Sequence, residues 1–210
     1  MTKSNKDKEI RHYNGIEYES EEELMTLLWL EELMDIGMIE KIERAETYSL
    51  SEPLVNEYEE LVQMKTKSKT VKKKQILLQG HEYTPEFKIT WTVKGRIQFL
   101  WMAYACIGIE GNIYPFAKLL IGDKEGHLQD PVTWIEVKPG WDQNNMTRLF
   151  KINQKWMWDK YKIYVNLIQP HKLFEDTWTP KKWLKTPSGK DRKVNWEIKT
   201  IEEYLELKSK

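Results

Sequence analysis

Cysteine is almost missing from this chain of 210 residues, in which Cys106 is the single thiol. One thiol forms neither an intramolecular disulfide nor a zinc site built from cysteines, so disulfide scaffolds and zinc-finger classes are excluded. The four histidines, at positions 12, 81, 127 and 171, are scattered without the spacing of metal ligands. The chain is therefore expected in a reducing compartment.

A long hydrophobic run is missing too. The longest apolar stretch, Ile97–Ile109, is interrupted by Gln98 and is too short to cross a bilayer as a helix. The first eleven residues are polar and lack the apolar core of a secretory signal, and a mobile tail is expected over residues 1–12. We expect a cytoplasmic protein with no membrane partner.

Net charge is absent from the chain as a whole, which holds 33 basic and 33 acidic side chains. Residues 1–64 hold 17 Asp and Glu against 6 Lys and Arg, whereas residues 65–210 hold 27 Lys and Arg against 16 Asp and Glu. Because local potential steers a charged partner, overall neutrality does not exclude a polyanion such as nucleic acid. The length suits one domain with a substantial core.

The stretch from Trp134 to Pro139 places a carboxylate and an ammonium two residues apart in what we interpret as a buried strand. Side chains alternate along a strand, so Glu136 and Lys138 share one face. Burying two charges is costly unless each is compensated. An ion pair on a half-exposed strand would compensate them, and so would a metal ion with a phosphate or a water molecule.

A helix is predicted to begin at Ser20, where Ser20 and Glu23 fit a capping box, and to end near Gly37. Glu23 falls at the start of the apolar stripe of this helix. It is either a capping glutamate or a functional carboxylate.

A second acidic candidate, Glu86, follows Pro85 at the entrance of a predicted strand. Phe87 and Ile89 share one face of that strand. The apolar stretch Ile97–Ile109 is predicted to be a buried central strand, within an insertion over residues 94–122.

Residues 63–75 form a basic loop or hairpin tip in this interpretation. Its lysines are either a solvated charge run or contacts to phosphate backbone, which lysine makes without sequence preference. They are Lys65, Lys67, Lys69, Lys72, Lys73 and Lys74.

After the Glu136 strand, a helix is predicted from Asn144 or Asn145 to Lys160, and a further strand ends at Ile168. Strand, helix and strand in this order form a βαβ unit, so the two strands should be parallel.

Residues 169–210 form a C-terminal extension rich in tryptophan and lysine, with a short terminal helix from Thr200. Its side chains either bind nucleic acid or, for the tryptophans, pack back onto the core. The candidates for nucleic-acid contact are Lys181, Lys182, Trp183 and Lys185.

The carboxylates indicate one chemistry when they are taken together. Mg²⁺ typically binds one or two carboxylates along with substrate phosphate and water. Glu86 and Glu136 would supply the carboxylates, and the main-chain carbonyl of Val137 a third oxygen. Lys138 would orient or help deprotonate the attacking water and stabilise charge on phosphoryl oxygens. The sequence thus favours metal-assisted hydrolysis of a phosphodiester.

Pro85-Glu86 followed by Glu136-Val137-Lys138 resembles the signature of the PD-(D/E)xK nuclease superfamily. The stretches Tyr13–Glu23 and Tyr83–Phe87 resemble phage-encoded members. Val137-Lys138-Pro139 is similar to the end of the metal strand in TnsA-type transposon endonucleases. The resemblance covers roughly residues 13–168.

The resemblance implies an α/β fold over residues 13–168, with a restriction-endonuclease-like core in which a mixed central β-sheet is flanked by helices. It implies a Mg²⁺-dependent endodeoxyribonuclease, with Mn²⁺ as a substitute metal, in the cytoplasm of a bacterial host if the chain is phage-encoded. DNA is the implied substrate, with structure specificity as a sub-hypothesis. Implied protein partners are a transposase or a phage recombination or replication protein, and a homodimer stays open.

The resemblance also assigns roles to individual residues. Glu86 takes the position of the first aspartate of the motif, Glu136 the second acidic position and Lys138 the lysine. Glu23 takes the place of the helix-borne glutamate of some members. Gln154 resembles an auxiliary glutamine of RecB-like members, although a plain polar helix position explains it as well.

This sequence departs from the motif at Glu86, which is longer by a methylene than the usual aspartate. The interval from Glu86 to Glu136 is also long and requires the insertion over residues 94–122. The alternative function is therefore a nuclease-fold protein, catalytically weak or inactive, that binds nucleic acid or a partner protein.

Overall fold

The computed structural model describes residues 11–102, 117–119, 132–140, 146–186 and 188–208. The chain divides into two compact units, one made of Met1–Ala45 with Pro85–Lys210 and the other of Glu46–Thr84. Helices and mixed sheets together place the protein in the α/β class. None of the described helices is both long enough and apolar enough to cross a membrane.

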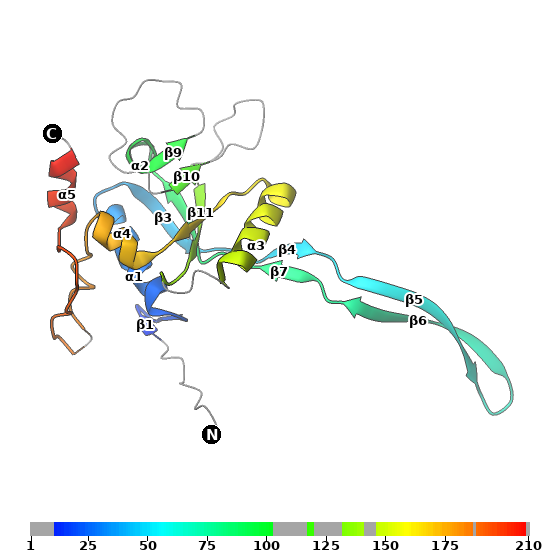
Figure 1. The fold of residues 1–210 in the computed structure, drawn as a ribbon. Helices are drawn as coiled ribbons and strands as arrows, with labels where there is room; N and C mark the ends of the chain where they lie inside the picture. Colours follow the sequence, from blue (N-terminus) through cyan, green and yellow to red (C-terminus); the bar gives the residue numbers. More distant parts are fainter. Residues whose placement is uncertain (1–10, 103–116, 120–131, 141–145, 187, 209–210) are drawn as a thin grey trace. The chain divides into compact units, whose positions relative to one another are not determined.

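The first unit is built on a four-stranded mixed sheet in the order β12-β11-β8-β3 (Figure 1). β11 runs parallel to β12 and antiparallel to β8, which is antiparallel to β3. The bounds are β3 (Ile39–Arg44), β8 (Phe87–Trp91), β11 (Val132–Val137) and β12 (Val165–Ile168). The predicted parallel pairing of the last two strands is confirmed.

The remaining elements of this unit are five helices and four short strands among its described residues. They are β1 (Arg11–Tyr13), β2 (Ile16–Tyr18), α1 (Glu21–Asp35), α2 (Val93–Phe99), β9 (Leu100–Met102), β10 (Ala117–Leu119), α3 (Met146–Tyr161), α4 (Pro170–Asp176) and α5 (Ile201–Lys208). Helix α3 connects β11 to β12, as predicted for the βαβ unit. The predicted terminal helix is α5.

The core of the first unit joins α1 to the C-terminal extension. Trp29 of α1 stacks on Trp178 with ring centroids 4.3 Å apart, and its indole N–H donates to the Thr177 hydroxyl at 3.0 Å. Both indoles are fully buried. The extension is therefore part of the core, which matches the alternative that its tryptophans pack inward.

The predicted central strand over Ile97–Ile109 is wrong at its start, because residues 93–99 form helix α2. The Thr92 hydroxyl caps this helix by accepting from the Gly95 N–H at 3.1 Å, and it donates to the Met38 carbonyl at 3.1 Å. A side chain at Gly95 would lie 1.9 Å from the Met38 carbonyl oxygen, so this contact requires glycine. The short strand β9 follows the helix, and residues 103–116 lie outside the described residues.

The second unit, Glu46–Thr84, consists of two antiparallel strand pairs. β4 (Tyr48–Ser51) pairs with β7 (His81–Tyr83), and β5 (Leu54–Gln63) pairs with β6 (Ser68–Leu78). The basic residues 63–75 thus cover the end of β5, the connecting turn and most of β6. Figure 1 shows β5 and β6 running side by side over their whole length.

Candidate active site

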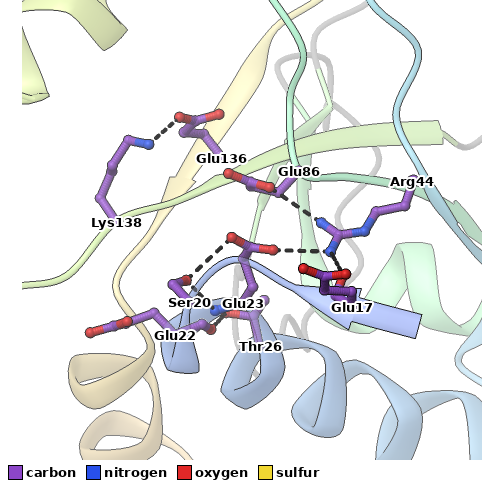
Figure 2. A network of polar contacts seen from close by, with 9 residues as sticks. All are labelled: Glu17, Ser20, Glu22, Glu23, Thr26, Arg44, Glu86, Glu136 and Lys138. Atoms are coloured by element: carbon purple, nitrogen blue, oxygen red, sulfur yellow. Dashed lines mark hydrogen bonds and ion pairs between the residues drawn. The ribbon is translucent and has the colours of Figure 1, made fainter. Parts of the chain in front are cut away.

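Three carboxylates from three elements of the first unit make up the carboxylate cluster, defined as Glu23, Glu86 and Glu136. Glu23 lies in the first turn of α1, Glu86 directly before β8, and Glu136 in β11. Figure 2 shows these side chains between Arg44 on one side and Lys138 on the other.

Glu23 is positioned by the start of helix α1. Ser20 adopts extended backbone angles, and its hydroxyl accepts from the Glu23 N–H at 3.1 Å. The same hydroxyl donates to Glu23 Oε1 at 3.3 Å. Glu23 is only 4% exposed, so capping fixes a nearly buried carboxylate at the edge of the sheet.

Glu86 is placed beside β11 by backbone pairing. Its N–H donates to the Ile135 carbonyl at 2.9 Å, next to the register pair of Phe87 and Ile135. One residue further along β11, Glu136 is 5% exposed. The two predicted metal carboxylates therefore come from adjacent strands.

Lys138 follows the end of β11, where its N–H donates to the Ile168 carbonyl at 3.0 Å. Its ammonium Nζ lies 2.5 Å from Glu136 Oε1, and the two side chains are 19% and 7% exposed. Glu136 and Lys138 therefore share a face, as the alternation of the strand predicts.

Arg44, at the end of β3, is the cation on the other side of the cluster. Its Nη2 lies 3.0 Å from Glu23 Oε2, and its Nη1 lies 3.3 Å from Glu86 Oε2. The guanidinium also lies over the rings of Tyr18 and Phe87, at 4.7 and 5.2 Å from their centroids. These contacts hold it against two carboxylates at once.

The charges of the cluster change the pKa of Glu86. Burial and, after it, the neighbouring charges of Glu23 and Glu136 raise the pKa of Glu86 to about 7, while Lys138 and Arg44 act in the opposite direction. A carboxyl group with so high a pKa is a recognised mark of functional sites. An added cation would relieve the repulsion between these carboxylates.

The donor atoms of the cluster suit a hard divalent cation, since all of them are carboxylate oxygens. Across the described residues, however, no group of three or more His, Cys, Asp or Glu side chains is arranged to hold a metal ion as it stands. The guanidinium of Arg44 lies against Glu23 and Glu86, where such an ion would bind. A metal bound by both Glu23 and Glu86 would require Arg44 to move away from at least one of them.

The auxiliary candidate Gln154 lies on α3. Its side-chain N–H donates to the Val165 carbonyl at 2.6 Å, so it supports the start of β12. Val137, whose carbonyl was predicted to bind the metal, is buried at the end of β11.

The predicted nucleic-acid residues of the C-terminal extension lie in intramolecular contacts. Lys182 Nζ lies 2.8 Å from Glu31 Oε2, and Lys181 Nζ lies 2.9 Å from Glu202 Oε1. Trp183 is 6% exposed, so its indole has no free face on which a base could stack. Lys185, at 3.6 Å from Asp191, is largely exposed.

Arg44 is the member of the site that the sequence analysis missed. The one signal available was its rarity, because residues 1–64 hold only 6 Lys and Arg. Its role depends on the pairing of β3 with β8, which sets Arg44 opposite Phe87 and next to Glu86.

Comparisons of this chain with protein-family models, with curated proteins and with solved structures found no match.

Proposed function

We propose that this chain is a metal-dependent endonuclease that hydrolyses phosphodiester bonds of DNA, with a restriction-endonuclease-like core. The observation that carries the proposal is the convergence of Glu23, Glu86 and Glu136 from three elements, with Lys138 against Glu136. A mixed sheet with β11 inside it and a βαβ connection to β12 is compatible with such a core.

Each residue of the cluster has a separate role in this proposal. Glu86 and Glu136 would hold a Mg²⁺ ion together with the main-chain carbonyl of Val137, and Glu23 would add negative charge from α1. The ion, when bound, neutralises charge on the phosphoryl group and activates a water molecule. Lys138 donates hydrogen bonds that orient this water and stabilise the phosphoryl oxygens. The water oxygen would bond to phosphorus and lose a proton to solvent, while the bond to the leaving sugar oxygen breaks and that oxygen takes up a proton from solvent.

Plasmid and branched DNA, incubated with the full chain and Mg²⁺, Mn²⁺ or EDTA, test this activity. The wild type should cut in either metal and not in EDTA, and Lys138→Ala should lose at least about 100-fold in rate, because the group that stabilises the transition state is gone. Lys172→Ala, which removes an exposed lysine of α4, is the matched control and should cut normally. Equal rates for both variants would sink the proposal.

One structural relationship favours the second candidate, a nuclease-fold protein that binds without cutting. Arg44 already forms ion pairs with both Glu23 and Glu86. If Arg44 cannot be displaced, the cluster is a structural ion network. DNA binding with no cleavage in either metal, by the wild type and by Arg44→Gln, would favour this candidate.

A transposase or a phage recombination or replication protein is the protein partner that this function would suit. A nuclease of such a complex is silent alone if its partner supplies DNA or an activating contact. Homodimerisation is compatible with the proposal and is read directly from the sedimentation of the purified chain.

A further inference from the structure

The β5–β6 hairpin is an exposed two-stranded ribbon. Its register runs from Leu54 opposite Leu78 to Gln63 opposite Ser68, and the Met64 N–H donates to the Lys67 carbonyl at 2.8 Å to close the turn. Both faces are exposed along nearly the whole ribbon, with only Val62 and Val71 half-buried. An isolated two-stranded ribbon is at best marginally stable in water, so its length needs a reason beyond packing.

The middle of the ribbon, residues 57–60 and 71–74, is a charge-balanced shaft. Its acidic residues are on β5 and its basic residues on β6. Lys74 Nζ lies 2.5 Å from Glu57 Oε1, and Lys73 forms an ion pair with Glu60. Lys72 is directly opposite Glu59. The shaft therefore presents little net charge to a partner.

The tip of the ribbon, residues 61–70, is different. It carries Lys65, Lys67 and Lys69 and no acidic residue. The next residues along the chain, from 71 to 80, contain no acidic residue either. Over the part of the chain that the structure describes, these three lysines form no ion pair. The positive charge of the hairpin is thus concentrated at its exposed end.

We infer that the tip of the β5–β6 hairpin binds the phosphate backbone of duplex DNA, with Lys65, Lys67 and Lys69 as its contacts. Lysines provide point charges that contact phosphates without sequence preference. A two-stranded β-ribbon has the width that the major groove of B-DNA admits. A second copy of the chain fits less well, because two cationic tips repel each other.

The sequence alone suggested that all six lysines of residues 63–75 contact phosphate. The structure divides them into shaft lysines close to carboxylates and tip lysines without an ion pair among the described residues. Lys73 and Lys74 already have carboxylate partners, and Lys72 is directly opposite Glu59, so within this run the three tip lysines should release most of the counterions on binding. Binding by the tip is also independent of cleavage, since a polyanion can be bound with no metal present.

The test is fluorescence anisotropy of labelled duplex DNA with the full chain in EDTA, over a range of salt. The tip variant combines Lys65→Gln, Lys67→Gln and Lys69→Gln. The matched shaft variant exchanges one ion pair, Glu60→Lys with Lys73→Glu, and keeps the net charge. Circular dichroism and thermal unfolding check that both variants fold like the wild type.

The tip variant should bind more weakly at low salt, and the shaft variant should bind like the wild type. Three lost phosphate contacts lower the slope of log affinity against log salt by about 2.7. Between about 50 and about 200 mM salt the wild type should therefore lose about 40-fold more affinity than the tip variant does. The result is a distinct salt dependence that a folding defect would not produce.

Several results would overturn the inference. They are an unchanged slope in the tip variant, an equal loss in the shaft variant, or no DNA binding by the wild type at low salt. A dimer that the tip variant disrupts, with DNA affinity unchanged, would show instead that the hairpin joins two copies.

Cleavage assays separate this inference from the proposed function. Binding that depends on the tip, without cleavage in Mg²⁺ or Mn²⁺, would support the inference and favour the candidate that binds without cutting. Cleavage that is lost in Lys138→Ala, together with DNA binding that does not depend on the tip, would support the nuclease and reject the inference about the tip.

Discussion

Arg44 joins Glu23 to Glu86: its Nη2 lies 3.0 Å from one carboxylate and its Nη1 lies 3.3 Å from the other. A single guanidinium thus forms ion pairs with a residue of α1 and with a residue at the entrance of β8. In the proposed nuclease, Arg44 and the metal ion compete for the carboxylate of Glu86.

Arg44→Gln should lower the free energy of unfolding by about 1 to 2 kcal/mol without metal, since the nearly buried Glu23 loses its partner. Added Mn²⁺ should then raise the Tm of this variant more than that of the wild type, because the competing cation is gone. Thermal unfolding with and without Mn²⁺ measures both effects.

Arg148→Gln, an exposed position on α3, is the control for the Arg44 experiment and should respond to Mn²⁺ like the wild type. An equal or smaller metal response in Arg44→Gln would show that Arg44 and the metal do not compete.

Glu86 should make the fold less stable as pH rises. Its pKa of about 7 lies above the ordinary 4.5, so between these values the folded state holds more protons than the unfolded state. By linkage, this stabilising contribution is complete below about pH 4.5 and is lost as pH rises through 7, to a total of about 3 kcal/mol. Glu86→Gln should not show this loss.

Urea unfolding at pH 5 and pH 8 measures the effect of Glu86. The stability of Glu86→Gln relative to the wild type should rise by about 2 to 3 kcal/mol between the two pH values. Glu82→Gln, at an exposed position of β7, should keep the pH dependence of the wild type. Parallel profiles for Glu86→Gln and the wild type would contradict the raised pKa.

Gly95→Ala should destabilise the first unit by about 2 to 3 kcal/mol, because the new methyl group collides with the Met38 carbonyl and forces α2 away. Gly140→Ala is the control, since a methyl group added at Gly140 would meet no atom within 4 Å and the stability should be nearly unchanged. Chemical unfolding compares the two. Similar stabilities would mean that α2 does not pack closely on Met38.

Trp178→Ala should lower the free energy of unfolding by about 3 to 5 kcal/mol, as for other fully buried aromatic residues. Trp156 of α3 is 42% exposed, so Trp156→Ala should cost only about 1 kcal/mol. If both substitutions had the same small effect, the C-terminal extension would not be part of the core.

Local sequence signals were sufficient where the deciding contacts are local. The cap at Ser20 gave the start of α1, and the βαβ pattern gave the parallel pairing of β11 with β12. The period of two placed Glu136 and Lys138 on one face. In each case the physical cause lies within a few residues or within one strand-helix-strand unit.

The features that could not be predicted from the sequence depend on contacts between residues far apart in the chain. Helix α2 begins directly after Thr92 because the hydroxyl of Thr92 and the backbone of Gly95 meet the backbone of Met38, more than 50 residues away. Arg44 reaches Glu86 through the register of β3 with β8. Trp183 is buried by Phe174 and by the guanidinium of Arg192, 3.6 Å from the centre of its ring.

The stacking of Trp29 on Trp178 also means that part of the core can form only late in the synthesis of this chain. The hydrogen bond beside it joins residues 148 positions apart, so α1 leaves the ribosome long before its partner. At about 5 to 20 residues per second, Trp29 waits roughly 7 to 30 seconds for the segment that covers it. A nascent chain halted before Trp178 should therefore be held by chaperones or aggregate, however complete its sheet.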